Sequence, residues 1–345
     1  MKIWKKLGID PRLVRLFNQF AYDASFIISR MRNMDKRKLK NQPLYGQLHR
    51  LSEQFAVDLE ALIMELISQA YEAAERKNDR ILMKYTKISG IAVAGKMLLK
   101  IFNRVSEDPA SITLDNILKQ TRNREAYQQF VKNKLKLSPR VWRISKQNLA
   151  QIELYASAGL AEGRSAVAIS RDLKKFLRNP DARFRRLRDP ETGKLKLSAP
   201  MKSYHPGKGV YRAAHKNDLR LTRTETNMAY RRADLHRWRN TDFVLGYEVK
   251  LSGAHPEYDI CDSMIGSYPK NFEFTGWHPA CFCIAVPVLA SQNDFKAYLE
   301  GQRIPKSKHV TGIPPNAFNY VKRNSEAFSR YQSKPFFLAD NFTKK

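Results

Sequence analysis

The sequence is poor in cysteine, and this shortage excludes a disulfide-stapled protein. Only three of its 345 residues are cysteines, at Cys261, Cys281 and Cys283. An odd number of cysteines crowded into one stretch does not make a disulfide framework for a chain of this length. The pattern instead indicates a reducing compartment or a metal site.

Long apolar runs are also missing. The most continuous one, from Ile88 to Leu99, contains Lys96 and is well short of the roughly 20 residues that a helix needs to span a bilayer. The residues after Met1–Lys6 do not form the apolar core of a secretory signal. We therefore expect neither a membrane span nor a signal peptide.

Acidic residues are scarce relative to basic ones. The chain has 33 Asp and Glu against 62 Lys and Arg, a formal net charge of +29. Its hydrophobic fraction of 43% is that of an ordinary globular protein, so folded structure carries the charge rather than a disordered polycation. The excess favours a polyanionic partner, either nucleic acid, an acidic protein surface, or both. The length predicts two or three domains.

Apolar spacing predicts helices over the first half of the chain. From Leu48 to Leu66 apolar residues recur every three or four positions, so a helix is expected to begin after Pro43 and to end near Asn78 and Asp79. Further helices are predicted over 11–32, 81–105, 113–135 and 139–163. A short helix capped by Ser165 is predicted to follow. We interpret these stripes as the core of a helical bundle.

The second half of the sequence predicts a mixed structure. A helix is expected over 210–240, and strands over 247–251 and 283–289, with Pro287 confining the second strand to an edge or a strand end. The predicted fold class is α+β and predominantly α-helical. The expected domains are a helical region over 1–160, a small α+β domain with a short antiparallel sheet over 161–295, and an extended tail over 296–345 that drapes over another surface.

A basic arm over 171–209 is the first candidate site. Its first part holds eight cations, which are Arg171, Lys174, Lys175, Arg178, Arg183, Arg185, Arg186 and Arg188. Charge runs are commonly solvated faces. Because Phe176, Phe184 and Leu187 interleave with the cations, an arm that contacts DNA phosphates or a portal is the competing interpretation. Such contacts position a protein without reading the base sequence.

The segment around Arg223-Thr224-Glu225 is the second candidate. Thr222 and Glu225 fit a capping box, in which each side chain satisfies a backbone donor at the other position. The alternative is a buried ion pair, or a catalytic acid or base, formed by Arg223 and Glu225.

A cluster of potential metal ligands is the third candidate. Five residues with thiol or imidazole ligand atoms fall within the stretch 255–283, namely His255, Cys261, His278, Cys281 and Cys283. Zinc prefers such ligands in tetrahedral sets, so a structural zinc site is one interpretation. Small buried cysteines beside a turn-forming His-Pro are the second, and a metal-activated nuclease site is the third.

Taken in order, these segments resemble the phage Mu F-like head morphogenesis, or minor head, proteins. The resemblance covers roughly residues 150–290. The matching positions are Arg223, Thr224 and Glu225; Gly246; Asp259, Cys261, Asp262 and Gly266; and His278, Pro279, Cys281 and Cys283.

The resemblance implies a non-enzymatic phage protein that associates with portal and capsid, assists head assembly and is found in the virion head near the portal. During assembly it would be in the host cytoplasm. Arg223, Thr224 and Glu225 would brace the Mu F-like domain, and a four-cysteine zinc site is implied. The chain departs from that site at Tyr258, where many members have Cys, so His255 or His278 would have to replace a cysteine. The alternatives are a zinc- or magnesium-dependent nuclease and a general nucleic-acid-binding protein with no virion role.

Overall fold

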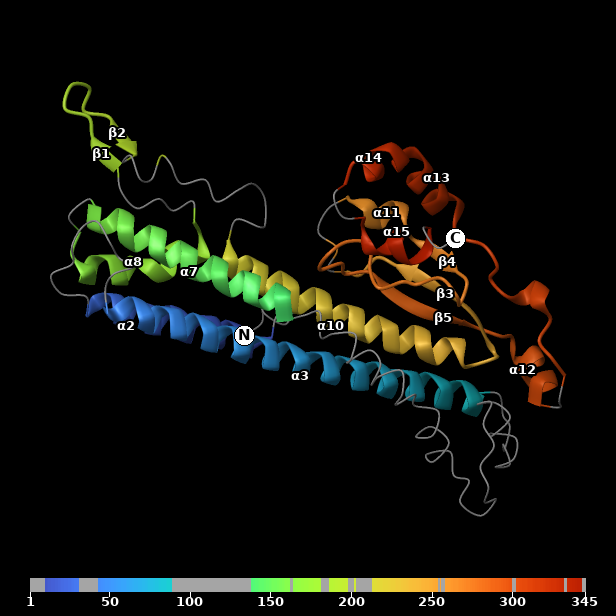
Figure 1. Ribbon diagram of the computed structural model, residues 1–345. Helices are drawn as coiled ribbons and strands as arrows, with labels where there is room; N and C mark the ends of the chain where they lie inside the picture. Colours follow the sequence, from blue (N-terminus) through green and yellow to red (C-terminus); the bar gives the residue numbers. More distant parts are fainter. Residues whose placement is uncertain are drawn as a thin grey trace, which may run out of the picture. The chain divides into compact units, whose positions relative to one another are not determined.

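The structure, a computed structural model, describes residues 10–30, 43–88, 138–161, 164–180, 186–197, 202, 213–253, 255, 258–299, 302–331 and 334–342. Across these residues it is predominantly helical, with antiparallel sheets of three and two strands (Figure 1). This confirms the predicted α+β fold class. The helix predicted over 113–135 lies outside the described residues, as does the part of the predicted helix 81–105 that follows Ile88; residues 81–88 belong to α3, so no separate helix begins at 81. None of the described helices combines the length and the apolar character needed to cross a membrane.

The chain divides into two compact units, and each unit combines two separate stretches of sequence. Unit 1 comprises Met1–Glu65 and Lys134–Arg223, and unit 2 comprises Leu66–Asn133 and Thr224–Lys345. The sequence predicts a sequential division at residue 160, so the observed units differ from the expected domains. Apolar periodicity indicates which segments are helical, but it does not indicate which helix packs on which.

Unit 1 is built from helices and one β-hairpin. Its helices are α2 (Pro11–Ser29), the first part of α3 (Pro43–Ile88), α7 (Ser138–Ala161), α8 (Ala166–Arg178) and the first part of α10 (Ala214–Arg239). Asp10 caps α2 by accepting a hydrogen bond from the backbone N–H of Arg12 at 2.8 Å. Ser165 caps α8 as predicted, accepting from the backbone N–H of Ala168 at 3.2 Å.

Aromatic side chains fill the core of unit 1. Phe20 of α2 lies 4.6 Å, centroid to centroid, from Phe55 of α3. Phe176 of α8 stacks on Tyr155 of α7 at 4.5 Å and is buried. The interpretation of Phe176 as part of a DNA-contacting arm is therefore wrong, because its ring is a core side chain of the helix that carries the cations.

A β-hairpin lies within the segment predicted to be a basic arm. Strands β1 (Arg186–Arg188) and β2 (Leu195–Leu197) pair antiparallel. In the turn between them, the Asp189 carboxylate accepts hydrogen bonds from two backbone N–H groups, and Gly193 adopts φ +65°. The residues of the turn and of β2 are mostly exposed.

Unit 2 places a small sheet beside the second parts of α3 and α10. Its further elements are β3 (Val244–Lys250), α11 (Ile260–Ser263), β4 (Gly266–Tyr268), β5 (Ile284–Leu289), α12 (Gln292–Leu299), the 3-10 helix η5 (Lys306–Lys308), α13 (Pro315–Arg323), α14 (Ser325–Ser329) and α15 (Phe336–Asn341). The strand order is β4-β3-β5, all antiparallel. Pro287 therefore lies on an edge strand, as predicted.

The core of unit 2 is aromatic and includes the C-terminal segment. Tyr247 of β3 stacks on Tyr268 of β4, and Trp277 packs edge-on against Phe337 of α15. The expectation of an extended tail is wrong, because this segment forms short helices whose apolar residues join the core. The segment is polar overall, but its few apolar side chains are buried where it packs against the core of unit 2.

Helix α3 continues through Asn78 and Asp79, where the sequence predicts its end. The Asn78 amide donates to Asp234 at 2.7 Å and accepts from the Trp238 indole N–H at 2.8 Å. The Asp79 carboxylate accepts from the Arg237 guanidinium at 2.9 Å. Residues that favour a helix end when solvated are thus buried in mid-helix, because α10 supplies their hydrogen-bond partners.

Candidate metal centre

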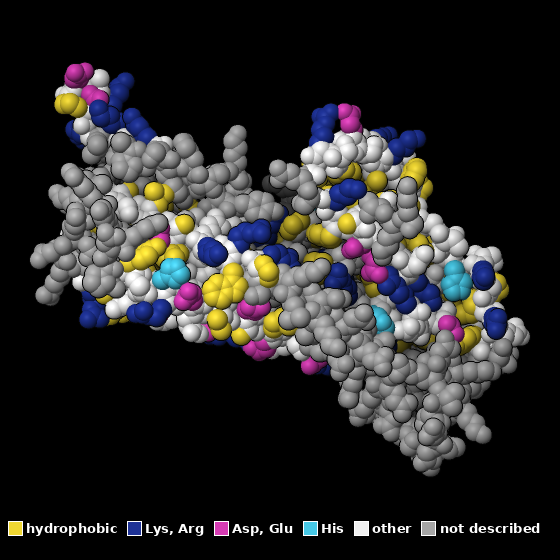
Figure 2. All heavy atoms as spheres, viewed as in Figure 1, with side chains coloured by type: hydrophobic (Ala, Val, Ile, Leu, Met, Phe, Trp, Pro, Cys, Tyr) yellow, Lys and Arg dark blue, Asp and Glu magenta, His cyan; other side chains and the backbone are white. Residues whose placement is uncertain are grey.

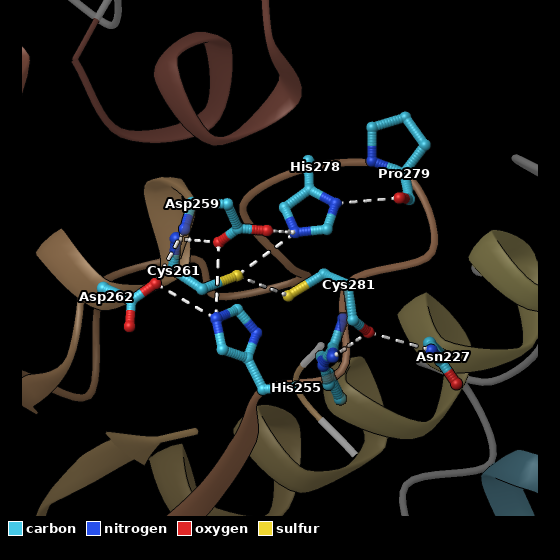
Figure 3. A network of polar contacts seen from close by, with 9 residues as sticks. Asn227, His255, Asp259, Cys261, Asp262, His278, Pro279 and Cys281 are labelled. Atoms are coloured by element: carbon cyan, nitrogen blue, oxygen red, sulfur yellow. Dashed lines mark hydrogen bonds and ion pairs between the residues drawn. The ribbon is translucent and has the colours of Figure 1, made fainter. Parts of the chain in front are cut away.

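Three of the five predicted ligand residues come together in unit 2. The sulfur of Cys261 lies 3.7 Å from the sulfur of Cys281 and 3.2 Å from Nε2 of His278 (Figure 3). One ligand atom from each residue lies within 4.8 Å of the others. Zinc with bonds of about 2.3 Å to sulfur holds two tetrahedral sulfur ligands about 3.8 Å apart. The cluster therefore has the ligand atoms and the spacing to hold a metal ion.

Cys283 is buried near these two cysteines and influences the pKa of both thiols. The sequence suggests that Cys281 and Cys283 would face opposite sides of a strand that begins there. Strand β5 begins only at Ile284, so strand alternation does not apply to these two residues. Both cysteines are instead buried in the loop over residues 275–283, here called the thiol loop.

His255 lies beside this cluster and contacts acidic residues. Its Nε2 is 3.0 Å from the Asp262 carboxylate and 3.8 Å from the Asp259 carboxylate. His255, Asp259 and Cys261 form a second group whose ligand atoms lie within 4.8 Å of one another, and this group shares Cys261 with the first. The structure thus places all five predicted ligands close to one another, with His255 next to the carboxylates of Asp259 and Asp262.

A capping box on α11 positions Cys261. The Asp259 carboxylate accepts from the backbone N–H of Cys261 at 2.6 Å, and the Asp262 carboxylate accepts from the backbone N–H of Asp259 at 2.8 Å. The Asp259 hydrogen bond, followed by that of His255, holds the pKa of Asp262 below its usual value. The second oxygen of Asp259 lies 3.2 Å from Nε2 of His278, so Asp259 links α11 to the thiol loop.

The ring of His278 is oriented by its own backbone segment. Its Nδ1 lies 2.9 Å from the carbonyl oxygen of Pro279. A carbonyl oxygen can only accept, so Nδ1 donates in this contact, and Nε2 faces both the Cys261 thiol and the Asp259 carboxylate. This arrangement, with one ring nitrogen anchored on a carbonyl and the other directed at the cluster, is the one that metal-binding histidines use.

A polar stripe on α10 holds the thiol loop. The hydroxyl oxygen of Thr224 accepts from the backbone N–H of Ala280 at 2.9 Å, and the amide of Asn227 donates to the Cys281 carbonyl at 3.1 Å. Arg231 donates to the carbonyls of Thr275, Cys281 and Cys283 at 2.7 to 2.8 Å. Because Thr224, Asn227 and Arg231 are spaced three and four residues apart, they share one face of the helix.

Two backbone conformations in the thiol loop depend on these contacts. Ala280 adopts φ +59°, which costs about 1–2 kcal/mol for a residue with a side chain. Gly276 adopts φ +128°, and a Cβ added there would lie 2.6 Å from a guanidinium nitrogen of Arg231. The close approach of Arg231 to the loop backbone therefore requires glycine at position 276.

Hydrogen bonds among the thiols separate their pKa values. Hydrogen bonds from Cys261 and Cys283, together with the nearby charge of Arg231, hold the pKa of Cys281 well below its usual value. The hydrogen bonds to Cys281 and Cys283 raise the pKa of Cys261. A lowered pKa favours the thiolate of Cys281, and a thiolate is the form in which cysteine binds metals.

The predicted capping box at Thr222 and Glu225 is wrong. Helix α10 begins at Ala214, and the Thr222 hydroxyl donates to the Asp218 carbonyl one turn earlier. Glu225 is buried in mid-helix. In the predicted brace, Thr224 bonds to the thiol loop, while burial lowers the pKa of Arg223 to about 10. The S/T-x-x-E spacing also occurs inside helices, and the preceding residues decide whether it marks a helix start.

The predicted cations over 171–188 are spread over several elements. Arg171, Lys174, Lys175 and Arg178 are exposed on α8, and Arg188 is exposed on β1. Arg183 and Arg185 lie outside the described residues, as does the side chain of Arg186. On the face drawn in Figure 2, Lys and Arg side chains are scattered rather than gathered in one patch.

Sequence reasoning missed Asn227 and Arg231. Their spacing from Thr224 is a signal that could have identified them, because polar residues at helical spacing share a face. Gly276 carried no comparable signal. Comparisons of the chain with protein-family models, curated proteins and solved structures found no match.

Proposed function

We propose that this chain is a non-enzymatic minor head protein of a tailed phage, which assists head assembly at the portal and contacts DNA without reading its sequence. The proposal starts from the resemblance to the Mu F-like head morphogenesis proteins. Its main structural support is that the sequence segments on which the resemblance depends contact one another around Cys261, His278, Cys281 and Cys283, here called the thiol cluster.

The convergence involves three segments that are separate in sequence. Thr224, from the Arg-Thr-Glu segment, bonds to Ala280 within the His-Pro-x-Cys-x-Cys segment. Asp259, from the Asp-x-Cys-Asp segment, contacts His278. Weak sequence matches that arose independently would have no reason to share contacts, whereas motifs of one domain family would.

Gly246 supports the same interpretation. It lies on β3, and a Cβ there would come within 2.7 Å of Val310 and 2.8 Å of the Tyr268 carbonyl. The glycine of the aromatic-glycine strand is thus explained by close packing in the same unit.

The metal that we propose for the cluster is a structural zinc ion. Cys261, His278 and Cys281 would hold it, and Cys283 is the candidate fourth ligand. When bound, zinc would cross-link α11 to the thiol loop. The three cysteines are each no more than 2% exposed, which favours a closed structural site over a catalytic site with an open water position.

A particle assay tests the virion role. We expect a portal-like reading frame beside the gene, and we expect this chain to co-purify with that portal protein and with assembled heads. Mass spectrometry of purified particles is the measurement. Absence of the chain from particles, combined with DNA binding, would favour a general nucleic-acid-binding protein instead.

A nuclease assay tests the non-enzymatic assignment. The purified chain is incubated with supercoiled plasmid and either Mg²⁺ or Zn²⁺, and the expected result is retarded but intact DNA at low salt. Cleavage that disappears in Glu225→Gln would contradict the proposal. Glutamine preserves the volume of this buried side chain, so the comparison isolates its carboxylate.

A further inference from the structure

A groove between α2 and α8 in unit 1 is not part of the proposed metal centre. It has a volume of about 340 Å³ and lies where the two helices run side by side (Figure 1). Its lining residues are Ala21, Tyr22, Ser25, Phe26 and Ser29 of α2, and Ser170, Arg171 and Lys174 of α8. Ligand pockets start at about this size.

Two aromatic side chains on the α2 side of this α2–α8 groove are exposed. Tyr22 is 65% and Phe26 is 53% exposed, and they stand one helical turn apart. Adjacent exposed aromatic rings beside a cavity are typical of protein interaction sites, where such rings supply most of the binding energy.

The α8 side of the groove is positively charged. Arg171 and Lys174 line the groove, and Arg178 continues the same helix face and donates to Asn18 of α2. No acidic side chain is among the groove's lining residues in the described part of the chain. Arg171 also pairs with Asp172 of its own helix at 3.4 Å, so Lys174 is the lining cation best placed to meet a carboxylate of an occupant.

The polar groups in the floor of the groove are already satisfied. The hydroxyls of Ser25, Ser29 and Ser170 each donate to a carbonyl of their own helix. An occupant thus needs to supply no hydrogen bonds to the floor. An apolar side chain fits this floor, with charge complementarity at one rim.

We infer that the α2–α8 groove binds an acidic segment of a partner protein, with one large apolar side chain of that segment anchored between Tyr22 and Phe26. An amphipathic helix in a groove is a recurring form of such recognition. The chain's own neighbouring stretches, 1–9 and 31–42, are rich in Lys and Arg, so charge disfavours them as the occupant. The inference does not depend on the phage-head assignment.

One contact favours a protein over single-stranded nucleic acid as the occupant. The guanidinium of Arg30 lies over the Phe26 ring, 5.4 Å from its centroid. Because a base stacks on a ring face, Arg30 leaves the Phe26 ring at most one face for a base. An apolar anchor needs only the ring edges and the cavity between them.

The test uses fluorescence anisotropy with the full chain and three fluorescein-labelled probes. Two are acidic, helix-forming peptides of about 16 residues with equal net charge, one carrying a central Phe-Leu pair and the other Ser-Ser. The third is an oligothymidine of similar length. We expect the Phe-Leu peptide to bind about tenfold more tightly than the Ser-Ser peptide.

Variants locate the effect. Tyr22→Ala combined with Phe26→Ala should abolish the preference for the Phe-Leu peptide. Lys174→Glu should weaken both peptides, while Lys175→Glu, at an exposed position on the same helix outside the groove, should weaken them clearly less. Because all four side chains are exposed or line the groove, circular dichroism and melting curves should match those of the unmodified chain.

Several results would overturn the inference. Equal binding of the two peptides would show that no apolar side chain is anchored in the groove. A preference for the Phe-Leu peptide that persists in the double aromatic variant would place the anchoring site elsewhere on the protein. Equal effects of Lys174→Glu and Lys175→Glu would reduce the interaction to general charge attraction. Loss of oligothymidine binding in the aromatic variant, with peptide binding unchanged, would make the groove a nucleic-acid platform.

Discussion

The guanidinium of Arg231 donates to the carbonyl oxygen of Cys281 at 2.8 Å, while the sulfur of Cys281 lies 3.7 Å from that of Cys261. Arg231 is itself buried, and its guanidinium packs over the ring of Phe274. A buried cation on α10 thus fixes the backbone of a residue whose side chain belongs to the thiol cluster.

Replacing Arg231 should destabilise unit 2 strongly. Arg231→Met removes this donor from the buried carbonyls of Thr275 and Cys283 and leaves the Cys281 carbonyl with Asn227 alone, so we expect a loss of about 3 kcal/mol or more in the free energy of unfolding. Arg231→Lys should recover only part of it, because one ammonium cannot reproduce the planar fork. Urea unfolding is the measurement. Arg323→Met, at an exposed position on α13, is the control and should stay within about 0.5 kcal/mol.

Gly276→Ala should disturb the same loop from the other side. The new Cβ would lie 2.6 Å from a guanidinium nitrogen of Arg231, at a φ that disfavours side chains, so we expect a loss of about 2 kcal/mol or more. Gly253→Ala is the matched control, because no atom lies within 4 Å of its added Cβ. Similar stabilities of the two variants would show that the Arg231 contact does not constrain the loop.

The candidate site was only partly predictable from sequence. Cysteine and histidine chemistry identified Cys261, His278 and Cys281, because few residue types bind soft metals. The supporting residues have no such chemical signature. Arg231 acts through backbone carbonyls, and Gly276 is needed because of a side chain 45 positions earlier. Contacts of this kind depend on how α10 packs on the loop, which periodicity does not reveal.

Asn78→Ala should be costly although the sequence suggests a solvated helix end. The substitution removes a donor to Asp234 and an acceptor for the Trp238 indole N–H, both buried, so we expect a loss of about 2–3 kcal/mol in unfolding free energy. Glu72→Ala, exposed on the same helix, should cost less than about 0.5 kcal/mol. Equal costs would place Asn78 in a solvated position and contradict the mid-helix packing.

The helices themselves were predicted more reliably than their ends. Apolar spacing identified α2, α7 and α10, and the Ser165 cap identified α8. The end of α3 was predicted too early because Asn and Asp favour a helix end only when their side chains are exposed to water, and Asn78 and Asp79 are buried. Once α10 supplies partners, the same side chains hold the helix in place.

His215 should make unit 1 less stable in mild acid. Burial, including contact with the Phe17 ring, together with the charges of Arg178 and Lys216, lowers its pKa from 6.5 to about 4. Between these values the unfolded chain binds a proton that the folded chain does not, so stability falls as pH drops from about 6.5 to about 4. The loss approaches about 3 kcal/mol.

Urea unfolding at several pH values checks the prediction for His215. His215→Gln should flatten this part of the pH dependence relative to the unmodified chain. His49→Gln, at an exposed position on α3, is the matched substitution for comparison. An unaltered slope in His215→Gln would mean that this histidine titrates alike in the folded and unfolded chain.

Metal removal should distinguish the two histidines near the thiols. If zinc is held by Cys261, His278 and Cys281, elemental analysis should find one zinc per chain, and chelation should lower the melting temperature. The stabilisation is about 3 kcal/mol when free zinc is a hundredfold above the dissociation constant. His278→Ala should lose zinc and the response to chelator, whereas His255→Ala should keep both, because His255 contacts Asp262. Equal loss of zinc in both variants would place His255 in the ligand set. If the unmodified chain is purified without zinc, the three thiols are hydrogen-bonded core residues and not metal ligands.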